Sequence, residues 1–132
     1  MPVQMGHIYY YDPPQVNDAN GSPLLLAHGF EQLGYRPWVV VSRDSINRNE
    51  DRRTAVVVPL STNLTKAKAH RVQIPAAEMI SNDPDKPFET SVALCDHVRV
   101  MDVSLIKREA GRVSESALRA IGAGLAFLFD IR

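Results

Sequence analysis

Three features are scarce in this sequence: cysteine, net charge and long hydrophobic stretches. The 132 residues contain one cysteine, which excludes an intrachain disulfide, and no cluster of cysteine and histidine has the spacing of a zinc site. Lysine plus arginine equal aspartate plus glutamate at 15 each, whereas dedicated nucleic-acid binders are often strongly basic. The neutral balance argues against broad polyanion binding but is compatible with a local positive cleft.

Signals for a membrane are also missing. The N-terminal sequence MPVQMGHIYYYDPP lacks the basic region and the apolar core of a signal peptide. No stretch approaches the ~18 consecutive apolar residues of a membrane-spanning helix. We therefore expect a soluble, cytoplasmic protein that uses no metal ion or other cofactor.

What the chain does contain is enough apolar material for one packed domain, which we expect to cover residues 1–132. Hydrophobic residues make up 45% of the sequence. Short apolar or alternating runs predict strands at 6–11, 38–42, 55–60, 71–74, 88–95 and 98–101. The pattern predicts an α+β or mainly β fold, a small SH3-like antiparallel β-barrel with short helices.

A C-terminal amphipathic helix is the clearest predicted element. Ser114 is a good N-cap for it. One face carries apolar residues at helical spacing, namely Leu118, Ile121, Leu125, Leu128 and Phe129. Gly122 and Gly124 each cost ~1 kcal/mol of helix stability relative to alanine, so they are either weak points or places where another backbone approaches. If another backbone approaches the helix at these glycines, they support a homodimer that packs through residues 114–131.

Proline, glycine and other turn formers give further local expectations. Pro59 has no N–H to donate, which favours a strand end or a sheet edge. Residues 79–87 predict a loop, and residues 103–111 predict a short turn ending at a glycine. Residues 13–30 predict a long loop, and the three leucines at 24–26 within it either close over the core or meet a partner.

Polar and titratable side chains stand at the ends of three predicted strands. In EQLGYRPWVVVS, residues 31–42, the carboxylate of Glu31 and the guanidinium of Arg36 precede an apolar strand. Rigid scaffolds usually present working side chains at such places. AVVVPLSTN (55–63) and SVALCDHVRVMD (91–102) end in a similar way. We expect the three ends to converge on one pocket.

The order and spacing of these motifs resemble the MazF/PemK (Kid) family of toxins, from about residue 5 to residue 131. The matching motifs are Gly29-x-Glu31, Arg36-Pro37 with three valines and Ser42, Asn47, VVPLSTN at 57–63, Ser91-Val92 with Leu94-Cys95-Asp96, Arg99, Asp102 and Gly111-Arg112-Val113-Ser114. The resemblance implies an endoribonuclease toxin of a type II toxin–antitoxin system, an mRNA interferase that cuts single-stranded RNA by metal-independent 2′-OH transesterification. It also implies a homodimer and a cognate antitoxin protein as partner.

That reaction needs a base for the 2′-hydroxyl, an acid for the leaving oxygen and fixed donors for the growing charge. Arg36 matches the catalytic arginine of the family, and its planar fork suits a phosphate. Ser61 stands where the family usually has threonine and keeps the hydroxyl donor, while Glu31 is the general-base or substrate-orienting residue. The expected substrate-binding residues are Thr62, Asn63, His28, Asp96 and Arg99. From the residues alone, a surface arginine and hydroxyls that cap a turn remain equally open.

Asp96 is predicted either to take part in catalysis or to have a structural role. In one branch of the family an arginine two residues before this aspartate takes part in catalysis, but this sequence has Leu94 there. The departure favours the mechanism built on the arginine and serine above, with Asp96 bonded to backbone near Arg99. Basic residues within 66–71 form a patch that is either solvated or lines an RNA groove, and Cys95 reads as a buried core thiol.

Two other functions remain open at this point: a non-catalytic small-barrel module that binds protein, and a CcdB-like gyrase poison. The neutral charge and the leucines at 24–26 mildly favour a protein partner. We also hypothesise that the antitoxin lays an acidic, apolar segment over the Arg36 cleft and displaces the loop 13–30. Otherwise the loop is a passive insert.

Overall fold

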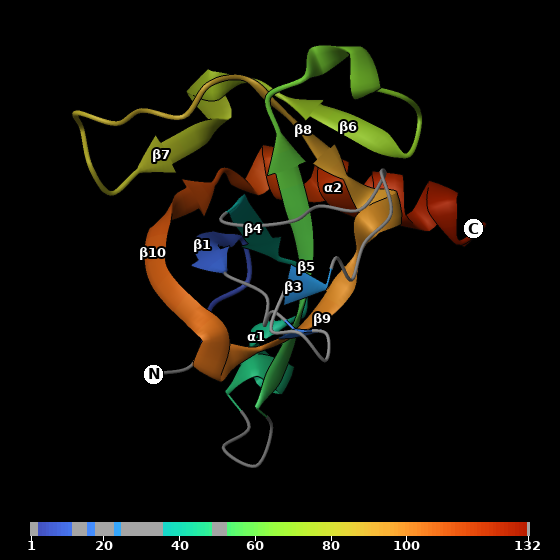
Figure 1. Cartoon of the computed structure of the whole chain (residues 1–132). Coiled ribbons are helices and arrows are strands. Elements are labelled where there is room, and N and C mark those ends of the chain that lie inside the picture. The colour runs from blue at the N-terminus through green and yellow to red at the C-terminus, as the bar shows by residue number, and fades with distance from the viewer. Residues whose placement is uncertain (1–2, 12–15, 18–22, 25–35, 49–52, 132) are drawn as a thin grey trace.

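The computed structural model describes residues 3–11, 16–17, 23–24, 36–48 and 53–131, and only these are discussed below. An antiparallel sheet in the order β6-β8-β5-β4-β1-β10-β7, with β9 also paired to β5, curls round on itself (Figure 1). Its strands are β1 (His7–Tyr11), β4 (Arg36–Val40), β5 (Thr54–Ser61), β6 (Arg71–Ile74), β7 (Met79–Ser81), β8 (Ser91–Leu94), β9 (Arg99–Asp102) and β10 (Ile106–Val113). A separate pair consists of β2 (Val16–Asn17) and β3 (Pro23–Leu24).

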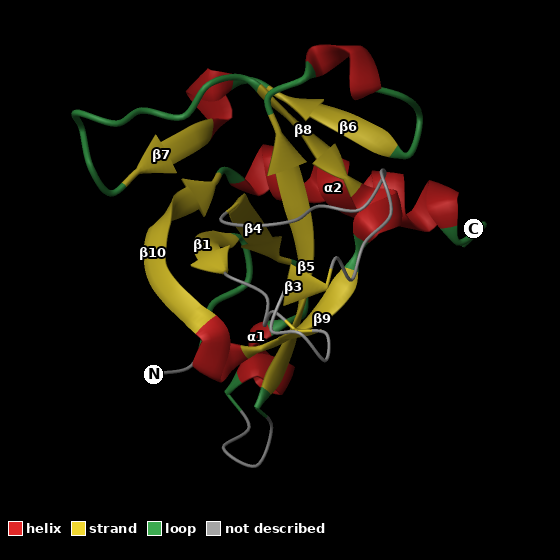
Figure 2. Ribbon diagram, in the orientation of Figure 1, coloured by secondary structure: helices red, strands yellow, loops and turns green. Residues whose placement is uncertain are grey.

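Helices are few, as the mainly β prediction requires (Figure 2). They are α1 (Asp44–Asn47), α2 (Glu115–Leu128) and short 3₁₀ turns at Leu64–Lys66, Ala76–Glu78, Cys95–His97 and Val103–Leu105. Within the described residues, none of them is long and apolar enough to cross a membrane.

Both faces of the sheet are packed, because alternate residues of each strand point to opposite sides. Ile8, Val39 and Val58 belong to the core cluster that also holds Ala117 and Ile121 of α2. Their neighbours Tyr9, Trp38 and Val57 belong to a second cluster, around which the sheet curls. Each buried side chain of this size contributes about 1.5–3 kcal/mol, so the two clusters together hold the curl closed.

β5 is the strand that joins the two halves of the sheet. On one edge it pairs with β4, and on the other its first half pairs with β9 and its last residues pair with β8. Pro59 is buried at the point where β5 changes its partner from β9 to β8. Pro59 pairs with neither strand on that edge, so its missing N–H interrupts no hydrogen-bonded pair there. The expectation of a strand end or sheet edge was therefore wrong, because a change of partner within a long strand has the same effect.

Two segments predicted as turn or loop are strands. Met79–Ser81 pairs with Gly111–Val113, and Ile106–Val113 pairs with β1 along its length. The pairing with β1 contains two register shifts, which break the alternation that sequence patterns detect. Gly111 allows the close approach to β7, since a Cβ there would lie 2.1 Å from the carbonyl oxygen of Ile80.

The C-terminal helix was predicted correctly in its start and in part of its face. The Ser114 hydroxyl accepts a hydrogen bond from the N–H of Ala117 at 3.0 Å, and Ile121 is fully buried. Phe129, predicted on the buried face, is 59% exposed. Figure 1 shows the reason: the C-terminal end of α2 projects beyond the sheet.

The two helix glycines differ in their surroundings. A Cβ on Gly124 would lie 2.8 Å from Cγ2 of Val72 and 3.0 Å from Sγ of Cys95, whereas a Cβ on Gly122 would meet nothing within 4 Å. Gly124 thus allows close packing within this chain, and not only against a second one.

This contrast gives a matched pair of substitutions. We expect Gly122→Ala to raise the free energy of unfolding by about 0.5–1 kcal/mol, because alanine favours the helix. Gly124→Ala should lower it by about 1–3 kcal/mol, because the new methyl overpacks the contact with β6. Urea denaturation of both variants measures the difference, and equal effects would contradict the packing described.

Candidate functional site

The register of the sheet brings two of the predicted catalytic positions into one row. Trp38 pairs with Pro59 and Val39 pairs with Val58. This pairing begins at Trp38 and Pro59, two residues from Arg36, the first residue of β4, and two residues from Ser61, the last residue of β5. Residues 25 positions apart in the sequence therefore become neighbours at one end of the two strands.

The side of the sheet that carries Ser61 also carries Arg99. Alternation along β5 puts Ser61 on the same side as Pro59 and Val57, and directly opposed residues of antiparallel strands share a side. Arg99 pairs with Val57, and its guanidinium lies 5.7 Å from the ring centroid of Trp38. This cation–π contact orients a positive charge on the Ser61 face of the sheet.

Ser61 is held rather than free to rotate at the surface. The residue is 4% exposed, and its hydroxyl oxygen accepts a hydrogen bond from the N–H of Asn63 at 3.3 Å. A hydroxyl that accepts a bond in this way keeps its own O–H available as a donor. Thr62, which follows it, is exposed to solvent.

Asn63 has a structural role in addition to any role with substrate. Its side-chain oxygen accepts from the N–H of Thr65 at 3.2 Å and from the Thr65 hydroxyl at 2.6 Å. It thereby caps the 3₁₀ turn Leu64–Lys66. The cap fixes the path of the chain directly after Ser61.

Asp96 is bound by the side chain of Arg71, a partner that the sequence did not predict. Arg71 donates from Nε to Oδ1 at 2.8 Å and from Nη2 to Oδ2 at 2.6 Å. This bidentate bond holds the pKa of Asp96 below its ordinary value. The expected partner, backbone near Arg99, was wrong because β6 brings a guanidinium to the carboxylate from another part of the chain.

The position of Arg71 follows from strand pairing. Arg71 lies directly opposite Leu94, the position at which the sequence has no arginine. Two imidazoles flank the same carboxylate, with Nε2 of His70 3.9 Å and Nε2 of His97 4.0 Å from Oδ2 of Asp96. Only the register between β6 and β8 reveals this cluster, so no spacing within the sequence could have predicted it.

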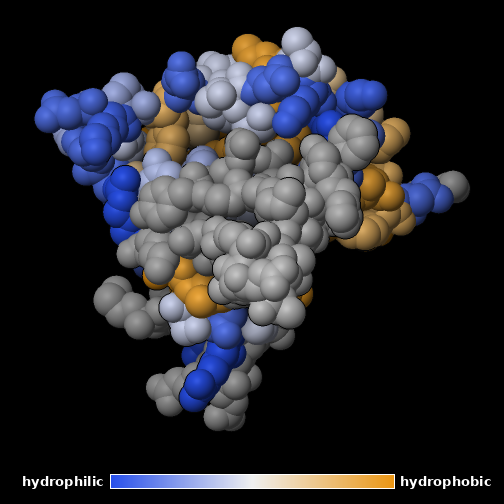
Figure 3. Space-filling model, viewed as in Figure 1, coloured by the Kyte–Doolittle hydropathy of each residue, from blue (hydrophilic) through white to orange (hydrophobic). Residues whose placement is uncertain are grey.

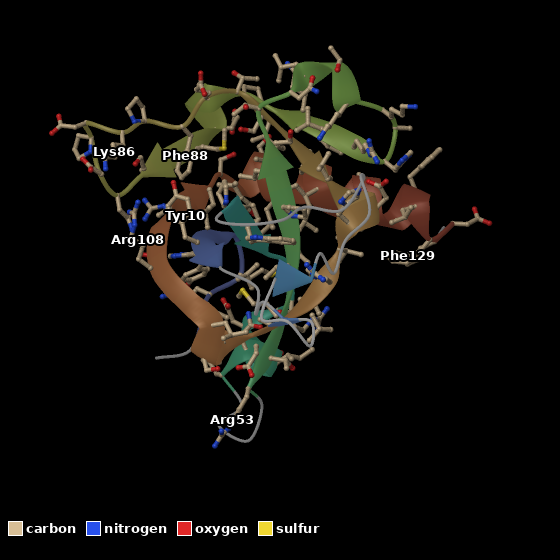
Figure 4. All side chains as sticks on the ribbon, in the orientation of Figure 1. Tyr10, Arg53, Lys86, Phe88, Arg108 and Phe129 are labelled. Carbon is tan, nitrogen blue, oxygen red and sulfur yellow. The ribbon has the colours of Figure 1, made fainter. Side chains whose placement is uncertain are left out.

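A second stacked arginine belongs to the other side of the sheet. Arg108 of β10 lies 4.5 Å from the ring centroid of Tyr10 of β1, and Figure 4 shows the two side chains close together. Tyr10 pairs with Pro37, one residue before Trp38, so it faces away from the Ser61 side. This pair therefore lies apart from the row described above.

Cys95 was predicted correctly as a core thiol. It is fully buried, and its Sγ lies 3.7 Å from the carbonyl oxygen of Ile121. Burial raises the pKa of the thiol to about 11, which opposes formation of a nucleophilic thiolate. Among the described residues, no group of three His, Cys, Asp or Glu side chains has the arrangement of a metal site.

Several expected site groups lie outside the described residues. Glu31 and His28 are among them, as is most of the loop 13–30, and Arg36 is described by its backbone alone. The groups that the structure does bring to one side of the sheet are Ser61, Arg99 and Arg71.

A protein family and several solved structures are similar to this chain. Residues 5–129 match the family described as PemK-like, MazF-like toxin of type II toxin-antitoxin system. No curated protein shows a significant match in sequence.

Solved structures share the fold along nearly the whole chain. MazF from Deinococcus radiodurans superposes with a TM-score of 0.69 at 20% identity, covering 99% of both chains. The Mycobacterium tuberculosis toxin MazF-mt6 gives 0.66 at 17% identity, covering 96% of this chain and 98% of its own. A mycobacterial endoribonuclease in complex with its cognate antitoxin gives 0.61 at 21% identity, covering 98% and 97%.

Proposed function

Because the chain belongs to the PemK-like, MazF-like toxin family of type II toxin–antitoxin systems, we propose that it is a sequence-specific endoribonuclease that cleaves single-stranded RNA in the cytoplasm without a metal ion. The observations that support the proposal are that Arg36 and Ser61 lie at the same end of the adjacent strands β4 and β5, and that Arg99 stacks over Trp38 on the Ser61 side of the sheet. A guanidinium and a hydroxyl at neighbouring strand ends match the two oxygens of one phosphodiester.

In the proposed reaction the 2′-oxygen of the RNA attacks the adjacent phosphorus. Glu31 takes the proton of the 2′-hydroxyl, and the bond from phosphorus to the 5′-oxygen breaks, leaving a 2′,3′-cyclic phosphate. The departing 5′-oxygen takes a proton from a water molecule and becomes a hydroxyl, and the hydroxide that remains is neutralised by the proton that Glu31 accepted. Arg36 and Ser61 donate to the phosphate oxygens, on which negative charge accumulates in the transition state.

The binding residues extend this site along the strand. Arg99 supplies a positive charge, and Thr62 supplies an exposed hydroxyl. Asn63 supplies its side-chain NH2 group, because the cap uses only its side-chain oxygen. His28 is proposed to contact the substrate from the loop, and Asp96 to act through its neighbours. Since phosphate contacts position a nucleic acid without reading its bases, the recognised sequence depends on other groups.

The first test is cleavage of a mixed single-stranded RNA by the purified protein in excess EDTA. We expect discrete fragments with 2′,3′-cyclic phosphate ends on a denaturing gel. Arg36→Ala should slow cleavage by about 10²–10³-fold, the usual loss for one positioned donor, and Ser61→Ala should slow it less.

The control is Arg53→Ala, which removes an exposed arginine at the opposite end of β5 (Figure 4). It should cleave like the unchanged protein. Activity that vanishes in EDTA and returns with magnesium would refute the mechanism, and a fully active Arg36→Ala would refute the site. No cleavage under any condition would favour a non-catalytic module or a gyrase poison.

A homodimer is proposed from the end of α2. Phe127, Phe129 and Ile131 are 63%, 59% and 66% exposed, and Figure 3 shows hydrophobic residues gathered at this end of the molecule. Exposed apolar groups that cluster commonly mark a protein interface. Sedimentation at micromolar concentration should give a dimer, and Phe127→Ser with Phe129→Ser should give a monomer. A monomeric unchanged protein would contradict the proposal.

An antitoxin is the second proposed partner. A similar fold occurs in an endoribonuclease bound to its cognate antitoxin, and an acidic segment over Arg36 would exclude RNA by occupying the guanidinium. Adding the antitoxin should stop RNA cleavage, and deleting residues 17–25 should weaken that inhibition. Unchanged inhibition of the shortened protein would remove the loop from this role.

A further inference from the structure

The ion pair between Arg71 and Asp96 is more than a tie between β6 and the turn Cys95–His97. We propose that it is the resting state of a second phosphate site, in which Arg71 exchanges the Asp96 carboxylate for an RNA phosphate next to the one that is cleaved. The identity of the ligand rests on the function proposed above, whereas the exchange itself rests on the geometry below.

Arg71 lies on the same side of the sheet as Ser61. Arg71 lies opposite Leu94, and Leu94 lies two residues along β8 from Val92, which pairs with Ser61. Residues related in this way point to the same side of a sheet. From strand spacing and residue rise, the Cα atoms of Ser61 and Arg71 are about 12 Å apart. One extended strand of RNA can therefore contact both groups at neighbouring phosphates.

The guanidinium of Arg71 has the chemistry to bind a phosphate in place of the Asp96 carboxylate. The guanidinium of Arg71 already holds two oxygens of one anion, at 2.8 and 2.6 Å. A phosphate offers the same two-oxygen edge, so the fork that fits Asp96 fits a phosphodiester equally well. The side chains of Arg71 and Asp96 are 21% and 25% exposed, which leaves the pair within reach of a ligand.

Two imidazoles lie close to the carboxylate that Arg71 leaves. Oδ2 of Asp96 has Nε2 of His70 at 3.9 Å and Nε2 of His97 at 4.0 Å. Small movements bring either imidazole into hydrogen-bond range. Asp96 then keeps a donor when Arg71 turns to the phosphate, so the exchange leaves no anion without a partner.

The two residues are consequently expected to affect RNA binding in opposite directions. Arg71→Gln removes the phosphate donor and should weaken binding about three- to ten-fold. The slope of log affinity against log salt concentration should become shallower by about 0.7, the value for one phosphate contact on a single strand. Asp96→Asn removes the competing anion and should strengthen binding.

The experiment uses fluorescence anisotropy with a labelled DNA copy of the RNA, which has no 2′-hydroxyl and cannot be cleaved by transesterification. Arg71→Lys is the conservative variant: it should keep the salt dependence and recover part of the affinity. A purely structural ion pair predicts that both single variants lose thermal stability and bind with unchanged salt dependence. Changes of the same sign, or no change, in the affinity of Arg71→Gln and Asp96→Asn overturn the inference.

Cleavage of the matching RNA by the unchanged protein is measured in parallel. Cleavage together with unaltered binding by the variants removes the second phosphate site and leaves the enzyme proposal intact. Opposite shifts in binding without cleavage retain the phosphate site and remove the enzyme proposal. Absence of any binding to the strand removes the phosphate site, and absence of RNA cleavage as well removes both proposals.

Discussion

The antiparallel register between β4 and β5 is the constraint on which the rest of the structure depends. It sets Trp38 opposite Pro59 in the middle of the sheet and brings Arg36 and Ser61 to the same end of the two strands. A slip of one residue would either turn Trp38 towards α2 or reverse the side of every group on β5. The register is fixed because both sides of these strands are buried, each in its own cluster.

β5 also decides which strands meet at the site. Its first half pairs with β9, which carries Arg99, and its last two residues pair with β8, which is flanked by β6 and Arg71. The changeover occurs at Pro59, a residue that cannot donate to a ladder. Positive groups from β9 and β6 thus reach the same side of the sheet as Ser61.

The neutral composition is consistent with this arrangement. The chain has as many acidic as basic residues, but the charges are placed locally rather than spread over one surface. Arg71 is balanced by Asp96, while Arg99 stacks on an aromatic ring. The Arg71 and Asp96 side chains are 21% and 25% exposed, so an anionic ligand can reach the guanidinium and compete with the carboxylate.

The sequence by itself determined the mainly β architecture, the start of α2 at Ser114 and the burial of Cys95. These depend on local patterns: alternation, an N-cap and an apolar run. It also singled out Arg36 and Ser61 through the order of its motifs. The tertiary structure alone decided the strand character of Ile106–Val113, the interior place of Pro59 and the partner of Asp96. In each of these cases the cause is a pairing between residues distant in the chain, and strand register leaves no periodic trace in the sequence of either strand.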